Sequence, residues 1–279
     1  MADLLELSAE IRAGDSTAAA AARADGVPAA GRLGELAEWL AAATGSWPPR
    51  VARVRLVHTD GLSAAVRGLA ADSGVGTRHL AVGVRDVEPA MDAAVAAADA
   101  EVDAGTGLLL LAAGDPAPAA VVAALLTGVE PVRLLPRGAA VTDSATWIAD
   151  AARLRDRLRA VRPLRHRPGA LLAELDRPGL AAACAFLLRA AARRTPLLLD
   201  GPGAVAAALL AADLRPRATQ WWRVADTGPD AVQPHALHHL GDRPVLDLGT
   251  ADGSGLAALL AFGILRAVPA LHRAEASDE

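Results

Sequence analysis

Short runs of Val, Leu and Ile recur along this 279-residue chain, each followed by a longer alanine-rich stretch of helical character. The runs are apolar without interruption, whereas a strand with one face in water alternates apolar and polar residues, so both faces of the predicted sheet are covered. Alternation of such strands with helices predicts an α/β fold with a doubly wound, mostly parallel six-stranded sheet. The predicted strands are Val54–Asp60, Arg78–Val84, Gly107–Ala113, Pro196–Asp200, Gln220–Ala225 and Pro244–Leu248. The predicted helices are Leu62–Ala71, Pro89–Ala104, Pro118–Leu126, Asp143–Ala160, Pro178–Arg193, Ala204–Ala212, Ala231–Leu240 and Leu256–Ala267.

The two ends of the chain are predicted to form a small helical subdomain beside this core. Gly31–Leu40 is amphipathic, because three leucines recur on one face of a helix there. We therefore divide the chain into an N-terminal helical subdomain (residues 1–50), an α/β core (51–268) and a polar tail (269–279).

Residue types that are absent exclude several classes of enzyme. The chain contains no Lys, so it holds neither a Walker-type phosphate loop nor a lysine that could form a Schiff base. All 28 cationic side chains are Arg, but the net charge is −4 and the arginines are scattered, so we expect no nucleic-acid-binding surface. The arginine-rich stretch at residues 153–167 is interpreted as a solvated helix end and linker rather than a phosphate patch.

Other features indicate a cytoplasmic protein with no metal and no membrane segment. Cys184 is the single cysteine and lies in an apolar run, so we expect a buried thiol. No further ligands accompany His235, His238 and His239, which are interpreted as histidines on a helix surface. The N-terminal segment carries acidic residues where a signal peptide is positively charged, and the apolar stretches are shorter than the ~20 residues of a membrane helix.

Aspartates beside glycines follow most of the predicted strands. A single Asp-Gly pair after a strand is common in turns and helix caps. Several together favour a shared, acidic, glycine-lined cleft, because the carboxyl ends of parallel strands meet at one edge of the sheet, where ligands bind. We expect these aspartates near that edge: Asp60, Asp115, Asp200, Asp226 and Asp252.

The glycine-rich segment at residues 244–255 resembles the first motif of S-adenosylmethionine-dependent methyltransferases. In those enzymes the motif opens the domain, because the strands that follow complete the site. Only one predicted helix follows Gly255 in this chain, so we set this assignment aside.

The same segment and two others carry a second resemblance. Residues 31–49 contain a Gly-Arg-Leu helix followed by a Pro-Pro pair, and residues 195–212 contain Pro-Leu-Leu-Leu-Asp-Gly before an alanine-rich helix. Residues 244–267 contain Leu-Asp-Leu-Gly, a glycine-rich loop and an apolar helix. In this order and spacing, over roughly residues 30–268, the chain resembles the nicotinate-nucleotide:dimethylbenzimidazole phosphoribosyltransferases of cobalamin lower-ligand assembly.

The resemblance implies a homodimer that transfers a phosphoribosyl group from nicotinate mononucleotide to dimethylbenzimidazole or a related aromatic base, with no metal or cofactor. A carboxylate takes the proton of the attacking base, and backbone N–H groups hold the phosphate. The family's catalytic glutamate falls on Asp252, which is the expected base. The expected substrate-binding residues are Gly253, Ser254, Gly255, Asp115, Asp200, Gly201 and Asp60.

The chain also departs from the family pattern. It has no Asn and therefore lacks the family's Gly-Asn-Thr-Thr phosphate loop. Residues 226–235 replace a Ser-His-Arg-Ser-Ala-Glu-Pro-Gly-His segment, and an Asp at position 252 is one methylene shorter than the family's Glu. Two functions remain open. One is an active transferase with a remodelled site, and the other is a catalytically silent paralogue that binds a nucleotide or base, or partners the intact enzyme.

Overall fold

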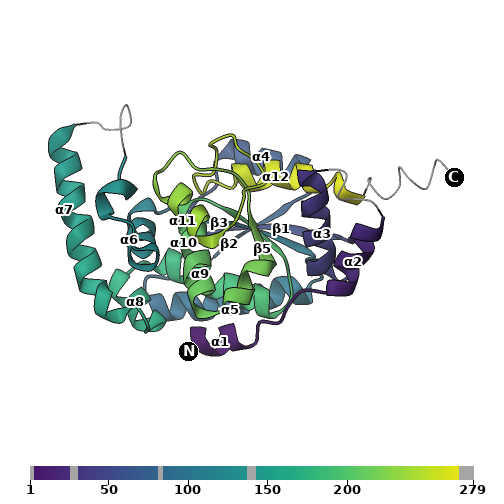
Figure 1. Cartoon of the computed structure of the whole chain (residues 1–279), viewed down its shortest axis with the longest axis horizontal. Helices are drawn as coiled ribbons and strands as arrows, with labels where there is room; N and C mark the ends of the chain where they lie inside the picture. Colours follow the sequence, from purple (N-terminus) through teal and green to yellow (C-terminus); the bar gives the residue numbers. More distant parts are fainter. Residues whose placement is uncertain (1–2, 26–30, 81–83, 137–142, 270–279) are drawn as a thin grey trace.

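Five parallel strands form the centre of the molecule, in the order β2-β1-β3-β4-β5 (Figure 1). The computed structural model describes residues 3–25, 31–80, 84–136 and 143–269. Every neighbouring pair of strands is parallel, so the predicted doubly wound, parallel α/β fold is confirmed. The strands are β1 (Val54–His58), β2 (Gly76–His79), β3 (Leu108–Ala112), β4 (Leu197–Asp200) and β5 (Trp222–Val224).

Helices cover both faces of this sheet (Figure 1). The α-helices are α1 (Leu4–Ala9), α2 (Ser16–Ala24), α3 (Arg32–Thr44), α4 (Ala64–Asp72), α5 (Val87–Asp103), α6 (Pro116–Thr127), α7 (Ser144–Val161), α8 (Pro168–Leu175), α9 (Pro178–Ala192), α10 (Pro202–Leu214), α11 (Val232–Leu240) and α12 (Leu256–Leu265). Short 3₁₀ segments are η2 (Pro131–Leu134), η4 (Arg162–Leu164) and η5 (Pro216–Trp221). Helices α6, α8, α9 and α10 each begin with proline, whose fixed φ suits the first helical position.

The leucines of β3 show why its sequence is apolar without alternation. Leu109 and Leu111 belong to an apolar cluster shared with α5, α6, α9 and α10, whereas Leu108 and Leu110 belong to a second cluster shared with α3, α4 and α12. Successive side chains of a strand point to opposite faces, and here all four leucines are fully buried. Both faces of the strand therefore lie in the core.

The predicted sixth strand, Pro244–Leu248, is wrong: the segment is not a strand in the part of the chain that the structure describes. It follows β5 for two hydrogen bonds, from Val245 N to Val224 O and from Leu246 N to Ala225 O, each 2.9 Å long. Leu248 N then donates to the side chain of Asp226 instead of a strand carbonyl, at 2.7 Å. Because a side chain takes this donor, the ladder stops and the chain turns away.

The other predicted strands are all present but shorter than expected, and the second and fifth differ most from their predicted bounds. Strand β2 ends at His79 rather than Val84, and residues 81–83 lie outside the described part of the chain. Gln220 and Trp221, predicted to open the fifth strand, belong to η5 instead.

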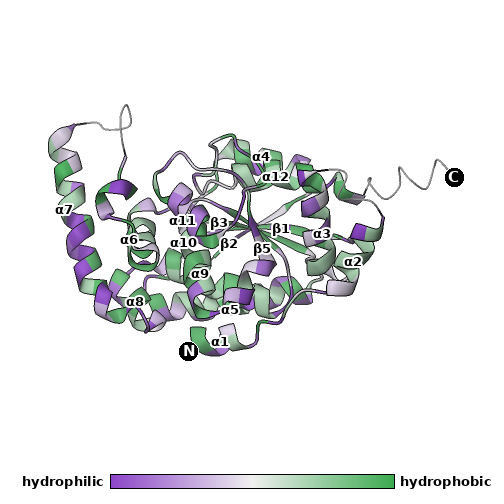
Figure 2. Ribbon diagram, viewed as in Figure 1, coloured by the Kyte–Doolittle hydropathy of each residue, from purple (hydrophilic) through white to green (hydrophobic). Residues whose placement is uncertain are grey.

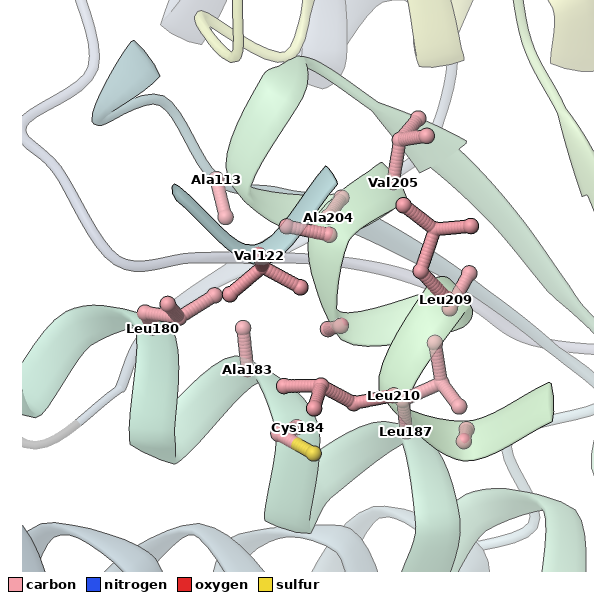
Figure 3. Close-up of a cluster of buried hydrophobic side chains, with 14 of the residues drawn as sticks. Ala113, Val122, Leu180, Ala183, Cys184, Leu187, Ala204, Val205, Leu209 and Leu210 are labelled. Carbon is pink, nitrogen blue, oxygen red and sulfur yellow. The ribbon is translucent and has the colours of Figure 1, made fainter. Parts of the chain in front are cut away.

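The predicted buried thiol of Cys184, which lies on α9, is confirmed. Its side chain lies among Val122, Leu187 and Leu210, from α6, α9 and α10 (Figure 3), and is fully buried. Burial raises the pKa of this thiol to about 12, so it stays protonated at neutral pH.

Helix α7 lies at the far side of α6 from the sheet and carries many of the chain's hydrophilic residues (Figures 1 and 2). The arginines at its exposed positions agree with the predicted solvated stretch.

Near the other end of the molecule, α2 contacts α3 and α3 contacts α12, while α1 contacts α9. The division of the chain at residue 50 stays a prediction, and residues 270–279 of the predicted tail lie outside the described residues.

Candidate active site

The predicted aspartates lie at the carboxyl edge of the sheet, as expected, and they divide into two groups. Asp60, Asp115 and Asp252 are exposed. Asp200 and Asp226 are completely buried. Exposed carboxylates can meet a substrate, whereas buried ones must be satisfied by partners within the protein.

Asp200, predicted to bind substrate, is instead enclosed in the protein. One carboxylate oxygen accepts a hydrogen bond from Gly253 N at 3.0 Å, and the other accepts one from Ala258 N at 3.1 Å. Gly253 belongs to the closing loop, by which we mean residues 249–255, and Ala258 lies in the first turn of α12. The side chain is therefore buried and joins the end of β4 to the closing loop and to α12.

Burial raises the pKa of Asp200 to about 7; the hydrogen bonds from Ala258 and Gly253 lower it, and the negative charge of Asp252 raises it further. The folded protein therefore holds a proton between about pH 4 and pH 7 that the unfolded chain has lost. The contribution of this proton to the free energy of unfolding therefore decreases as the pH rises through this window, and it does not change further above about pH 7.

We expect this linkage to be visible when wild type is compared with Asp200→Asn, which cannot titrate. The free energy of unfolding of wild type, relative to that of the variant, should decrease by up to about 4 kcal/mol between pH 4 and pH 7. Urea unfolding at a series of pH values measures the difference. A difference that does not change with pH would contradict the raised pKa.

Glycines allow the closing loop to lie directly against the sheet. A Cβ atom on Gly201 would lie 2.3 Å from Gly253 Cα, and one on Gly253 would lie 2.4 Å from Gly114 N. Both residues have φ above +90°, at 94° and 92°, a region that other residues avoid. Gly201 and Gly253, predicted to bind substrate, are buried and serve this backbone contact.

Asp252 and Asp60 flank the same glycine. The carbonyl oxygen of Asp252 lies 3.6 Å from the Cβ position of Gly114, and the carboxylate of Asp60 accepts a hydrogen bond from Gly114 N at 3.1 Å. One carboxylate oxygen of Asp252 accepts from Ser254 N at 2.8 Å, and its side chain is exposed. Gly255, by contrast, is buried against Leu56.

Asp115 stands between this edge and a large cavity. It precedes α6 with a left-handed φ of 55°, and its carboxylate lies 3.7 Å from Nε of Arg177. Burial raises the pKa of Asp115; Arg177 lowers it, and the negative charge of Asp60 raises it further.

The cavity has a volume of 1190 Å³ and is lined by the start of α6, by η2, α7 and Arg177, and by the loop and first turn of α11. Ligand pockets commonly measure ~300–1,000 Å³, so a nucleotide and a base fit together. None of the five predicted aspartates belongs to the part of its lining that the structure describes. Four of its lining residues are arginines, namely Arg133, Arg153, Arg157 and Arg177.

The sequence analysis interpreted the stretch with Arg153 and Arg157 as solvated rather than as a phosphate patch, and it did not consider Arg133 or Arg177, yet all four line the cavity. Arg153 and Arg157 lie one helical turn apart around Leu154, and all three line the cavity. Their four-residue spacing puts them on one face of α7, and that spacing was the available signal. Among the described residues, no group of His, Cys, Asp and Glu has the arrangement of a metal site, and no helix is long and apolar enough to cross a membrane.

Comparisons with known protein families, sequences and solved structures point to the same family. Residues 61–279 match a phosphoribosyltransferase family. The nicotinate-nucleotide–dimethylbenzimidazole phosphoribosyltransferase of Mycobacterium ulcerans is 37% identical over 328 residues, covering 94% of this chain and 91% of the relative. The enzyme of the same name from Mycobacterium avium is 35% identical over 318 residues, covering 91% of each chain. The solved structure of CobT from Thermus thermophilus matches with a TM-score of 0.75 at 25% identity, covering 88% of this chain and 91% of that one.

The alignment with the Mycobacterium ulcerans relative is longer than the 279 residues of this chain. That relative therefore contains internal segments that this chain lacks.

Proposed function

The chain belongs to the phosphoribosyltransferase family, and from this premise we propose that it transfers a phosphoribosyl group from nicotinate mononucleotide to dimethylbenzimidazole or a related aromatic base. The observation that carries the proposal is the exposed carboxylate of Asp252 in the closing loop, whose backbone packs against Gly114 at the carboxyl edge of the sheet. This is where ligands bind in open α/β sheets.

The reaction is a displacement at the anomeric carbon of the ribose. A ring nitrogen of the base forms a bond to that carbon, while the bond to the nicotinate nitrogen breaks and its electron pair stays on nicotinate. The other ring nitrogen of the attacking base then carries an acidic proton. We assign Asp252 as the group that accepts this proton, because a carboxylate is a suitable base and this one is exposed.

The remaining site residues are proposed from their positions. Ser254 supports the closing loop through its N–H bond to Asp252, and Asp60 and Asp115 define the acidic rim. Nicotinate mononucleotide carries a phosphate and a carboxylate, the groups that the planar fork of arginine binds best. We therefore assign the arginines of the cavity to these two anionic groups, in place of the absent phosphate loop.

A direct assay tests this function. The protein is incubated with nicotinate mononucleotide and dimethylbenzimidazole, and both nicotinate and the ribosylated base are measured by chromatography. The proposal expects the two products in equal amounts, and only when both substrates are present. Binding of nicotinate mononucleotide by calorimetry with no product formed would identify a silent binder and refute the transferase.

We further propose that the protein is a homodimer. Its composition is apolar, with a mean hydropathy of +0.28, and Ile148 on α7 is 63% exposed. Apolar side chains left in water on a chain of this size favour a protein interface. Sedimentation at micromolar concentration should give twice the 28.4 kDa mass of one chain, and a single monomer boundary would count against the dimer.

A further inference from the structure

Asp226 follows β5, and its carboxylate accepts hydrogen bonds from Leu248 and Thr250 at the start of the closing loop as well as from the adjacent Thr227. One carboxylate oxygen accepts hydrogen bonds from Leu248 N at 2.7 Å and Thr227 N at 2.8 Å. The other accepts from Thr250 N at 2.9 Å and Thr250 Oγ1 at 2.6 Å. This one buried side chain thus holds the start of the closing loop.

Neighbouring groups continue the same support up to residue 251. Thr227 O accepts a hydrogen bond from Ala251 N at 3.1 Å, and Nε2 of the buried Gln233 donates to Ala251 O. Asp226, Thr227 and Gln233 all lie in residues 226–235, the segment that replaces the family's Ser-His-Arg-Ser-Ala-Glu-Pro-Gly-His motif. The segment at residues 226–235 therefore supplies the contacts that fix the backbone directly before Asp252.

Asp252 is consequently held from both sides. Thr250 is bound to Asp226 at the end of β5, and Gly253 is bound to Asp200 at the end of β4. A base must lie within hydrogen-bond reach of the proton it removes, and a misplacement of ~1 Å can reduce the rate by ~100-fold. We propose that Asp226 is a positioning residue, which sets the position of the Asp252 carboxylate through Thr250 and Ala251. This inference rests on the proposed role of Asp252 as the base.

The charge state of Asp226 suits this task. Burial by itself would raise its pKa, but the hydrogen bonds from Thr250, Leu248 and Thr227 outweigh that effect and keep the pKa below its usual value. An ionised carboxylate accepts hydrogen bonds only, which matches the donors around it. An asparagine at this position would turn an amide N–H₂ toward either the Leu248 N–H or the Thr250 N–H.

Asp226→Asn should therefore lower kcat at least about 10-fold while KM for nicotinate mononucleotide changes by less than about 3-fold, since the base is misplaced and substrate binding is not. Hydrogen exchange at the amides of Leu248 and Thr250 should accelerate in the same variant. Both are measured well below the melting temperature of the variant.

Asp242→Asn is the matched control. Asp242 also accepts hydrogen bonds at β5, from Val224 N at 3.1 Å and Arg243 N at 2.9 Å, but these donors lie outside the closing loop. This variant should lose stability and retain kcat within about 3-fold of wild type.

Three results would overturn the inference: a kcat of Asp226→Asn equal to that of wild type, an equal loss in Asp242→Asn, or unchanged exchange at Leu248 and Thr250. Failure of the proposed function is a different result, because wild type itself would then form no product or Asp252→Asn would remain active. The exchange measurement tests the support of the loop in either case.

Discussion

Asp252→Asn should remove most of the turnover, by about 100-fold or more, and leave the fold and the binding of nicotinate mononucleotide nearly unchanged. General base catalysis contributes ~10²–10⁴-fold, and an amide has the shape of the carboxylate but cannot accept the proton at neutral pH. The measurement is the rate of nicotinate release with dimethylbenzimidazole as acceptor, together with calorimetric binding of nicotinate mononucleotide.

Asp252→Glu is the control, because it retains the carboxylate and moves it toward the position of the family's glutamate. It should keep substantial activity. If Asp252→Asn is as active as wild type, the base lies elsewhere, and Asp115 becomes the candidate. Asp115 is exposed, and its carboxylate lies 3.7 Å from Nε of Arg177, which lines the cavity.

Gly253→Ala should cost about 5 kcal/mol of folding free energy, or abolish folding. Two effects add: the side chain is forced into a left-handed conformation at φ 92°, and its Cβ would lie 2.4 Å from the backbone nitrogen of Gly114. Backbone strain of this kind costs ~1–3 kcal/mol, and forcing an atom into a filled space costs a similar amount or more. Urea unfolding measures the loss.

Gly249→Ala separates the two effects. Gly249 belongs to the same loop and has φ 73°, but no neighbouring atom lies within 4 Å of its Cβ position. In this variant only the backbone strain should lower the free energy of unfolding, by about 1 kcal/mol. Equal losses in both variants would show that the close approach of Gly253 to Gly114 does not limit stability.

Much of the site could be located from the sequence because its elements are local. The apolar runs at Val54, Gly107 and Pro196 predict strands with both faces covered, and an aspartate after such a strand must lie at the carboxyl edge. The prediction of a sixth strand failed because the competing contact was distant in sequence. Nothing in residues 244–248 shows that Leu248 N is bound by Asp226, 22 residues earlier.

The parallel α/β fold, the family resemblance and the edge at which the aspartates gather could be predicted from the sequence, since each depends on residues close together in the chain or on the order of motifs. Which aspartates are buried and which are exposed depends on the tertiary structure. Asp200 and Asp252 each precede a glycine, yet Asp200 is buried and bonded to α12 while Asp252 stays exposed. Burial depends on what packs over a residue from elsewhere in the chain, so two Asp-Gly pairs give one carboxylate that is enclosed and supports the loop and another that is exposed.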